Sequence, residues 1–188
     1  MNLIAIADAF AARAHAAVVN KDGSIGHLRK YSKEPYITHP REVAALVASH
    51  GASDEEVAAA LAHDVLEDTP ITAEQMIAAL GERVTRIVWE VTDVPKWVGN
   101  SERREVFDHA RRAAASVSGQ NITCADMISN TKSIAAHDPR FARYYLPKKE
   151  GLLRWMTRAN PEIYDLAWKT LRDGQRLLVQ HALDPGNG

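Results

Sequence analysis

Residues 58–69 read AAALAHDVLEDT, an apolar run that ends in a dense group of polar side chains. Because residues four apart on a helix share a face, His63 is predicted to stack over Glu67, and Asp64 over Asp68. Carboxylates this close raise one another's pKa and destabilise a helix unless a cation compensates them. The stretch therefore predicts a buried helix whose polar end binds a divalent metal ion.

The residues on either side of this stretch supply its boundaries. Ser53 and Glu56 have the spacing of a helix capping box, so one helix is expected over 53–68. The Thr-Pro pair at 69–70 interrupts that helix, and a second capping box at Thr72 and Gln75 starts the next one.

The rest of the chain carries the same helical signals. Apolar residues recur at helical spacing, Gly and Pro punctuate the segments, and no alternating stretch of useful length predicts a strand. We expect helices over 2–19, 40–50, 72–80, 84–91, 101–117, 122–136, 141–157 and 161–183, with an exposed loop at 20–35 and a turn at 118–120. The fold class is therefore predicted as all-α, a helical bundle in one domain over 1–188, with core motifs in 29–136 and scaffold helices in 141–183.

Composition narrows the class of protein. The chain has 188 residues, of which 46% are hydrophobic, and its formal net charge of -1 gives no general attraction to a polyanion. We expect no nucleic-acid partner, and no membrane span because no run reaches about 20 apolar residues. Cys124 is the only cysteine, so neither an intrachain disulfide nor a thiolate zinc site is expected, which fits a cytoplasmic protein.

A metal ion needs more ligands than His63 and Asp64 provide. His39, at a helix start before Pro40, and Asp126, within an apolar helical pattern, are the best-placed additions. Mixed imidazole and carboxylate ligands favour manganese, iron or zinc. Taken singly, each of these residues could equally be a surface or core side chain, and only the combination favours a metal site.

Two further patterns remain open at this level. Asp126, Asn130, Ser133 and His137 follow a spacing that lines one helical face with polar groups, which could face either a pocket or water. His137 and Asp138 form a second His-Asp pair, which shows that such a pair is weak evidence by itself.

Four segments together resemble a known family. They are 35–40 (PYITHP), 60–69 (ALAHDVLEDT), 91–93 (VTD) and 124–133 (CADMISNTKS), and they resemble the hydrolase domain of RelA/SpoT homologues over about residues 7–136. In size the chain is similar to the small alarmone hydrolases, which remove the 3′-pyrophosphate of (p)ppGpp with one manganese ion. The resemblance implies an enzyme of this type with Mn²⁺ as cofactor and a small nucleotide as substrate.

The resemblance also implies roles for single residues. The metal ligands are His39, His63, Asp64 and Asp126, the catalytic pair that handles water and protons is Glu67 and Asp68, and the substrate-binding residues are Arg29, Lys30, Tyr36, Asn130, Lys132 and Ser133. Lys132 stands where an arginine is more usual, and a lysine lacks the bidentate fork of a guanidinium group.

Other departures leave alternatives open. The loop at 16–28 looks longer than in the small hydrolases, so an adenine alarmone, (p)ppApp, stays open beside (p)ppGpp. No synthetase domain follows, so we expect hydrolysis only. The rival functions are an HD-type nucleotidase or NADPH phosphatase and, from another class, a catalytically silent nucleotide-binding module. A homodimer is left open.

Overall fold

The computed structural model describes residues 2–183. In this part of the chain the regular secondary structure consists of helices. The helices are α1 (Leu3–Ala16), α2 (Thr38–Ala48), α3 (Asp54–Ala62), α4 (Val65–Asp68), α5 (Ala73–Leu80), α6 (Glu82–Val91), η1 (Lys96–Val98), α7 (Ser101–Ala114), α8 (Val117–His137), α9 (Pro139–Leu153) and α10 (Pro161–Leu183). The predicted all-α fold is confirmed. None of the helices within 2–183 has both the length and the apolar composition needed to cross a bilayer.

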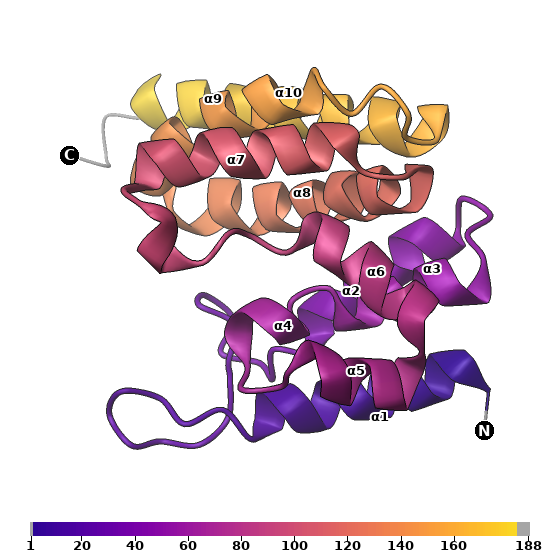
Figure 1. Cartoon of the computed structure of the whole chain (residues 1–188). Coiled ribbons are helices and arrows are strands. Elements are labelled where there is room, and N and C mark those ends of the chain that lie inside the picture. Colours follow the sequence, from indigo (N-terminus) through magenta and orange to yellow (C-terminus); the bar gives the residue numbers. More distant parts are fainter. Residues whose placement is uncertain (1, 184–188) are drawn as a thin grey trace.

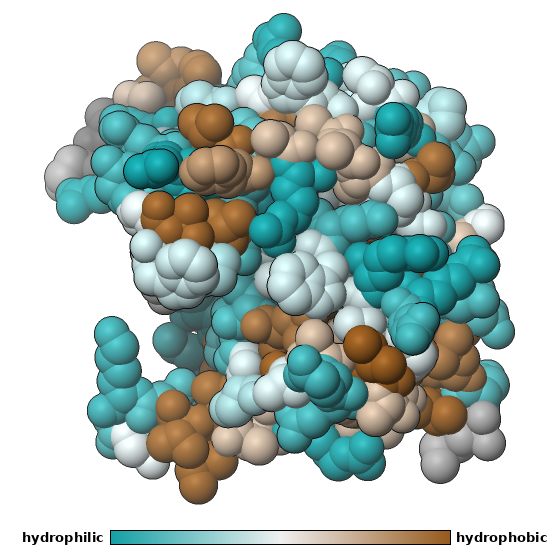
Figure 2. Space-filling model, viewed as in Figure 1, coloured by the Kyte–Doolittle hydropathy of each residue, from teal (hydrophilic) through white to brown (hydrophobic). Residues whose placement is uncertain are grey.

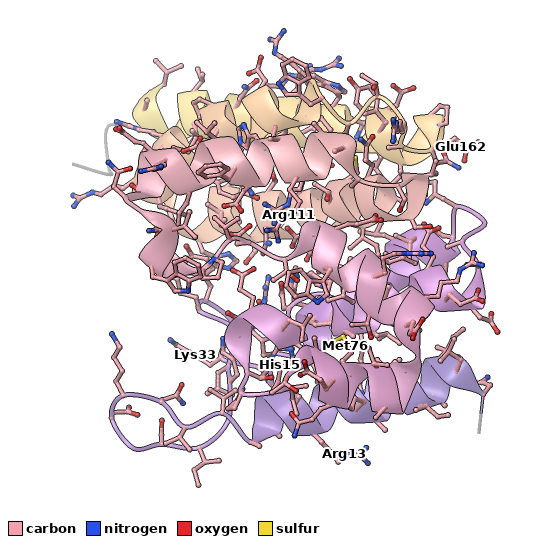
Figure 3. The ribbon with its side chains drawn as sticks, viewed as in Figure 1. Arg13, His15, Lys33, Met76, Arg111 and Glu162 are labelled. Atoms are coloured by element: carbon pink, nitrogen blue, oxygen red, sulfur yellow. The ribbon has the colours of Figure 1, made fainter. Side chains whose placement is uncertain are left out.

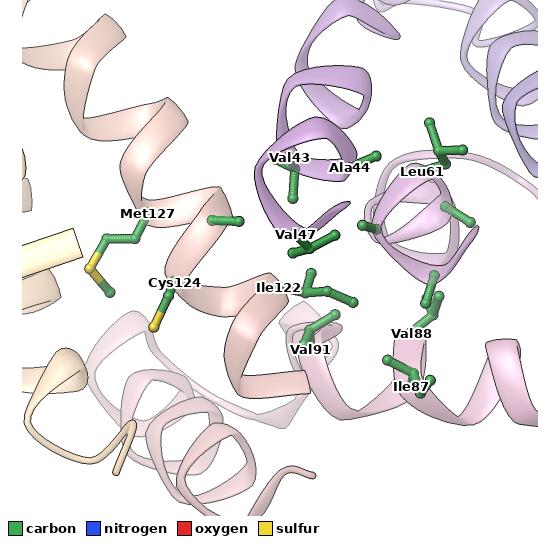
Figure 4. Close-up of a cluster of buried hydrophobic side chains, with 14 of the residues drawn as sticks. Val43, Ala44, Val47, Leu61, Ile87, Val88, Val91, Ile122, Cys124 and Met127 are labelled. Carbon is green, nitrogen blue, oxygen red and sulfur yellow. The ribbon is translucent and has the colours of Figure 1, made fainter. Parts of the chain in front are cut away.

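The helices form two layers, and α8 of one layer packs against the other. Helices α7 to α10 make one layer, and α1 to α6 make the other (Figure 1). Helix α8 packs on α10 and α9 on one side and on α2 on the other. Figure 4 shows the resulting core, where side chains of α2, α3, α6 and α8 meet, among them the buried Cys124. Elements far apart in the sequence are thus held together by apolar burial.

The two predicted capping boxes have different outcomes. Thr72 and Gln75 form a complete box, in which each side chain accepts a hydrogen bond from the backbone of the other residue. Ser53 does cap α3, but the Glu56 carboxylate does not return to the helix start. It is buried instead and accepts hydrogen bonds from Ser118 Oγ and Asn121 Nδ2, both at 2.9 Å. The prediction of the first box was half wrong, because partners on α8 compete for the carboxylate.

The turn predicted at 118–120 is wrong. Helix α8 already begins at Val117, and Ser116 is its N-cap. Gly119 is needed within this helix because a Cβ there would lie 2.6 Å from Glu90 Oε2. The glycine therefore marks a close approach of two helices and not a chain reversal.

The helix predicted over 53–68 is interrupted at His63 and Asp64, where α3 ends and α4 has not begun. His63 Nδ1 donates a hydrogen bond to the Ala60 carbonyl at 2.8 Å, the acceptor that a continued helix would use for the Asp64 amide. A side chain thus replaces the backbone donor at this point. Because the helix is interrupted here, the adjacent side chains of His63 and Asp64 can point toward the same place.

The loop at 20–35 has more order than the sequence predicted. Two antiparallel bridges pair Val19 with Ile25 and Leu28 with Pro35. Between the second pair the chain turns back tightly, and Lys33 takes a left-handed conformation with φ of 61°. The segment from Leu28 to Pro35 is therefore a defined hairpin-like loop, which we call the 28–35 loop.

Candidate active site

Three helices place four predicted metal ligands around one point. His39 comes from the first turn of α2, His63 and Asp64 from the interruption after α3, and Asp126 from the middle of α8. His39 Nε2 lies 3.0 Å from Asp126 Oδ1 and 3.6 Å from Asp64 Oδ2, and His63 Nε2 lies 3.2 Å from the same Asp64 oxygen. One atom from each of His39, His63 and Asp126 lies within 4.8 Å of the others.

The hydrogen bonds of both imidazoles leave their inner nitrogen atoms free. His63 Nδ1 is engaged by the Ala60 carbonyl, and His39 Nδ1 lies 3.0 Å from Ser129 Oγ. The Ser129 hydroxyl donates in turn to Glu42 Oε2 at 2.6 Å, so it accepts from His39. Each Nε2 atom is buried without a hydrogen-bond partner. Such an atom is costly unless it binds something, so the residues fit a divalent cation.

The charge balance at this centre also favours a cation. Burial disfavours a charged His63, but Asp64 and Asp126 outweigh it and raise the pKa of this imidazole. Burial similarly opposes ionisation of Asp126, yet His39 and His63 hold its pKa below the usual range. The pocket therefore stabilises positive charge between two carboxylates, which is the environment that a bound metal ion supplies.

Tyr36, predicted as a substrate-binding residue, lies against the predicted ligand Asp64. Its hydroxyl donates to Asp64 Oδ2 at 2.7 Å. On its other side the ring stacks on His27, with ring centroids 3.7 Å apart and planes 8° from parallel. His15 completes the group at 4.7 Å from the Tyr36 ring. Both histidines therefore pack against the Tyr36 ring and hold it in place.

The polar face of α8 leads outward from the metal centre. Asn130 Nδ2 donates to Asp126 Oδ1 at 2.6 Å, and its own amide oxygen accepts from Arg29 Nη1 at 3.4 Å. Of the predicted polar stripe, Asn130 and Ser133 line a cavity, whereas His137 at its end is exposed. Lys132 points elsewhere and is exposed, so its predicted contact with the substrate stays a prediction.

The predicted catalytic pair lies at the edge of this centre. Glu67 Oε2 accepts a hydrogen bond from the Asp93 amide at 3.2 Å. Desolvation, together with the nearby Asp93 and Asp64, raises the pKa of Glu67 to about 8. Desolvation and Asp64 raise the pKa of Asp68 to about 6. Both groups can therefore exchange protons near neutral pH, which general acid–base chemistry requires.

A cavity of about 290 Å³, which we call the basic cavity, opens between α7 and α9, and its charged lining consists of Arg104, Arg112, Lys148 and Lys149 together with Asp93, Glu105 and Asp108. Arg112 Nη1 lies 2.6 Å from Asp93 Oδ1, and Lys149 also lines the cavity. Desolvation and the neighbouring Arg112 lower the pKa of Lys149. An anion entering here would relieve the repulsion between these two cations.

A larger cavity of about 610 Å³ adjoins Glu67 on the other side, and its lining includes Trp89 and Arg111. Figure 3 shows Arg111 between the two layers, whereas His15 lies at the level of α1 and α4. The guanidinium group of Arg111 donates to the Thr92 carbonyl at 2.8 Å and is thereby fixed. The predicted catalytic residue Glu67 also lines this cavity.

A third cavity of about 320 Å³ contains most of the residues predicted to bind the nucleotide. It is lined by His27, Leu28, Arg29, Lys30, Tyr31, Tyr36, Asn130, Ser133, Ile134 and Phe141. Figure 2 shows the surface hollowed at the left, between the loops below and the layer of α7 to α10 above. The mixture of flat aromatic groups and polar groups suits a planar nitrogenous base.

Several residues of the site were not found by sequence reasoning. Ser129 and Glu42 each stand three residues after a predicted ligand, on the same helical face, and this spacing could have identified them. Arg112 and Lys149 gave no such signal. Their place beside the catalytic pair depends on how α7 and α9 pack.

Comparison with known proteins agrees with this geometry. A family model described as an HD domain matches residues 7–171. A probable guanosine-3′,5′-bis(diphosphate) 3′-pyrophosphohydrolase of Synechocystis is 32% identical over 164 residues, which cover 81% of this chain and 21% of that protein. The enzyme of that activity from Danio rerio is 33% identical over 102 residues, covering 53% of this chain and 56% of that one.

Solved structures show the same fold. That of a metazoan ortholog of SpoT, described as hydrolysing ppGpp, has a TM-score of 0.78 at 22% identity and covers 95% of this chain and 97% of its own. The chain spans only about a fifth of the length of the Synechocystis relative, 21%. Because the family model covers most of the sequence, from residue 7 to residue 171, the chain belongs to the HD domain family.

Proposed function

We propose that this protein is a metal-dependent hydrolase that removes the 3′-pyrophosphate from a guanosine alarmone, ppGpp or pppGpp. One observation carries the proposal: two buried imidazole Nε2 atoms without partners face Asp64 and Asp126, beside a glutamate whose pKa is raised to about 8. The sequence similarity to guanosine-3′,5′-bis(diphosphate) 3′-pyrophosphohydrolases supports the choice of substrate.

His39, His63, Asp64 and Asp126 would hold the metal ion. Mixed imidazole and carboxylate ligands suit manganese, iron or zinc, and we propose Mn²⁺ because the small alarmone hydrolases that the sequence resembles use manganese. When bound, such an ion polarises a phosphate group and lowers the pKa of water. Tyr36 and the Ser129–Glu42 pair keep the ligands oriented, through hydrogen bonds to Asp64 and His39.

Glu67 and Asp68 would manage the protons. Hydrolysis adds a water oxygen to the phosphorus attached to the 3′ oxygen of the ribose. The bond between that phosphorus and the 3′ oxygen breaks. Glu67, once ionised, would accept a proton from the attacking water, and the pair would return a proton to the departing 3′ oxygen. A bound cation would stabilise the ionised form of Glu67 and lower its pKa, which would suit it to act as the base.

Two cavities, one between the 28–35 loop and α8 and the other between α7 and α9, would position the substrate. The base would occupy the cavity between the 28–35 loop and α8, near Arg29 and Asn130. The phosphates at the other end of the nucleotide would lie toward Arg112 and Lys149 in the basic cavity. Holding both ends aligns the scissile bond with the catalytic pair, and such positioning dominates phosphoryl chemistry.

The test is product analysis by chromatography after metal-free protein is incubated with ppGpp, ppApp, NADPH and nucleoside monophosphates, with and without Mn²⁺. Manganese-dependent release of intact pyrophosphate from ppGpp is expected. Pyrophosphate from ppApp alone would move the specificity to adenine. Orthophosphate from NADPH or the monophosphates alone would replace the proposal by a phosphatase or nucleotidase function, and no product from any substrate would favour a silent binding module.

A further inference from the structure

The second His-Asp pair, His137 and Asp138, lies at the corner between α8 and α9, and the proposed chemistry does not use it. Asp138 is the N-cap of α9, since its Oδ1 accepts from the Phe141 amide at 3.0 Å. Its other oxygen crosses to the 28–35 loop. Oδ2 accepts from Lys30 Nζ at 2.9 Å and from the Tyr31 hydroxyl at 3.0 Å. One carboxylate thus joins the start of a helix to a loop 107 residues earlier.

The ring of Tyr31 has a second contact at the same corner. It stacks on His137, with ring centroids 5.5 Å apart and planes 13° from parallel. His137 is itself oriented, because its Nδ1 lies 2.8 Å from the Ser133 carbonyl. Lys30 Nζ lies 5.5 Å from the Phe141 ring. The tip of the loop is therefore attached to the corner by one shared carboxylate and by flanking aromatic contacts.

These contacts join the two walls of the nucleotide cavity. One wall consists of residues 27–31 and Tyr36, and the other consists of Phe141 and of Asn130, Ser133 and Ile134 on α8. Deep in the cavity the walls meet through Arg29 and Asn130, at a long distance of 3.4 Å. At the rim, the contacts of Asp138 are shorter, at 2.9 and 3.0 Å. The distance between the walls therefore depends on Asp138 more than on the inner contact.

We propose that Asp138 is a positioning residue that sets the width of the nucleotide cavity by fixing Lys30 and Tyr31 to the start of α9. It acts on the affinity for the base and not on the chemical step, because its contacts lie at the rim and none reaches a metal ligand or the catalytic pair. The identity of the ligand rests on the proposed function, whereas the attachment of the loop does not.

The substitution Asp138→Asn distinguishes the two roles of this side chain, which are to attach the 28–35 loop and to cap α9. Asparagine is as good an N-cap as aspartate, so α9 should keep its start while the ion pair with Lys30 is lost. The matched control is Asp173→Asn, which removes exposed ion pairs with Lys169 and Arg176 on α10. Two measurements use the whole 188-residue chain: hydrogen exchange of the backbone amides of residues 28–34 without nucleotide, and KM and kcat for ppGpp with Mn²⁺.

We expect faster exchange of these amides in Asp138→Asn, a KM higher by about five-fold, and a kcat within about two-fold of the wild-type value. Asp173→Asn should change none of these. Unchanged exchange would overturn the attachment, whether or not the protein hydrolyses ppGpp. Faster exchange with an unchanged KM would overturn the control of affinity, and a fall in kcat at constant KM would place Asp138 in the chemistry instead.

Discussion

The metal centre and the nucleotide cavity meet at Asn130 but are built in different ways. His39 and His63 are 2% and 5% exposed and come from helices that pack in the core. The far wall of the cavity is a loop, and the Lys30 side chain there is 68% exposed. Moving a ligand would disturb buried apolar contacts, whereas changing the loop would not. In the proposed function, the chemistry would thus be tied to the fold, while the choice of base would depend on contacts that can change without unfolding the protein.

The largest loss of metal affinity and activity is expected when a predicted metal ligand is removed. Asp64→Ala removes a carboxylate that lies within 3.6 Å of both inner imidazole nitrogens. We expect the affinity for Mn²⁺ in isothermal titration calorimetry to fall by more than about 100-fold and ppGpp hydrolysis to be lost with it. Asp165→Ala, on the exposed face of α10, is the control. Normal manganese binding by Asp64→Ala would show that the centre is not built as proposed.

A change at the edge of the centre should separate binding from turnover. Glu67→Gln keeps the shape of the side chain but cannot accept a proton from water. The expected result is a kcat lower by about 10² to 10⁴-fold with nearly unchanged affinity for Mn²⁺. Glu82→Gln, in the exposed first turn of α6, should leave both values unchanged. Full turnover by Glu67→Gln would assign the base to another residue.

Removing a hydrogen-bond partner of a predicted ligand should weaken metal binding to a smaller extent. Ser129→Ala breaks the hydrogen-bonded connection from His39 to Glu42, and the imidazole is then free to rotate or change tautomer. We expect Mn²⁺ to bind about 10 to 100-fold more weakly. Ser133→Ala, one turn further along α8, removes a hydroxyl from the nucleotide cavity instead. If both variants lose metal affinity equally, the loss is not specific to the connection.

The smallest expected effect is on the pH dependence of folding stability. In the metal-free protein the pKa of Glu67 is raised from 4.5 to about 8, so the folded state binds this proton more tightly than the unfolded state. Stability should therefore fall as pH rises from about 4.5 to about 8. Removing the charge with Glu67→Gln should flatten this dependence and raise the Tm at pH 8.5 by about 2 to 4 °C. Parallel pH profiles of the two proteins in thermal unfolding would contradict the assignment.

The sequence predicted the helical class and the polar residues at the centre because both leave local signals. Helical spacing marks Asp126 within an apolar pattern, and Pro40 marks the helix start that carries His39. The structure brings these residues together with His63 and Asp64, although their roles as ligands stay predictions.

What the sequence could not predict depends on contacts between elements. Glu56 has the spacing of a capping residue, but its carboxylate turns to Ser118 and Asn121 once α8 packs against α3. The interruption after Ala62 depends on the single bond from His63 Nδ1 to a carbonyl, which no propensity encodes. Asp138 is conspicuous in the sequence, yet its partners lie 107 and 108 residues earlier.

The buried carboxylate of Glu56 has a consequence for the distances at the metal centre. It stands two helical turns before His63, and its partners Ser118 and Asn121 precede Asp126 on α8. Asn121 also accepts from the Asn160 amide at 2.7 Å, which adds the start of α10. This network prevents α3 and α8 from sliding along each other. A binding site must hold its groups to within about 0.5 Å of the productive geometry. In the proposed metal site, the spacing between His63 and Asp126 would therefore depend in part on the Glu56 carboxylate, which does not itself contact the ion.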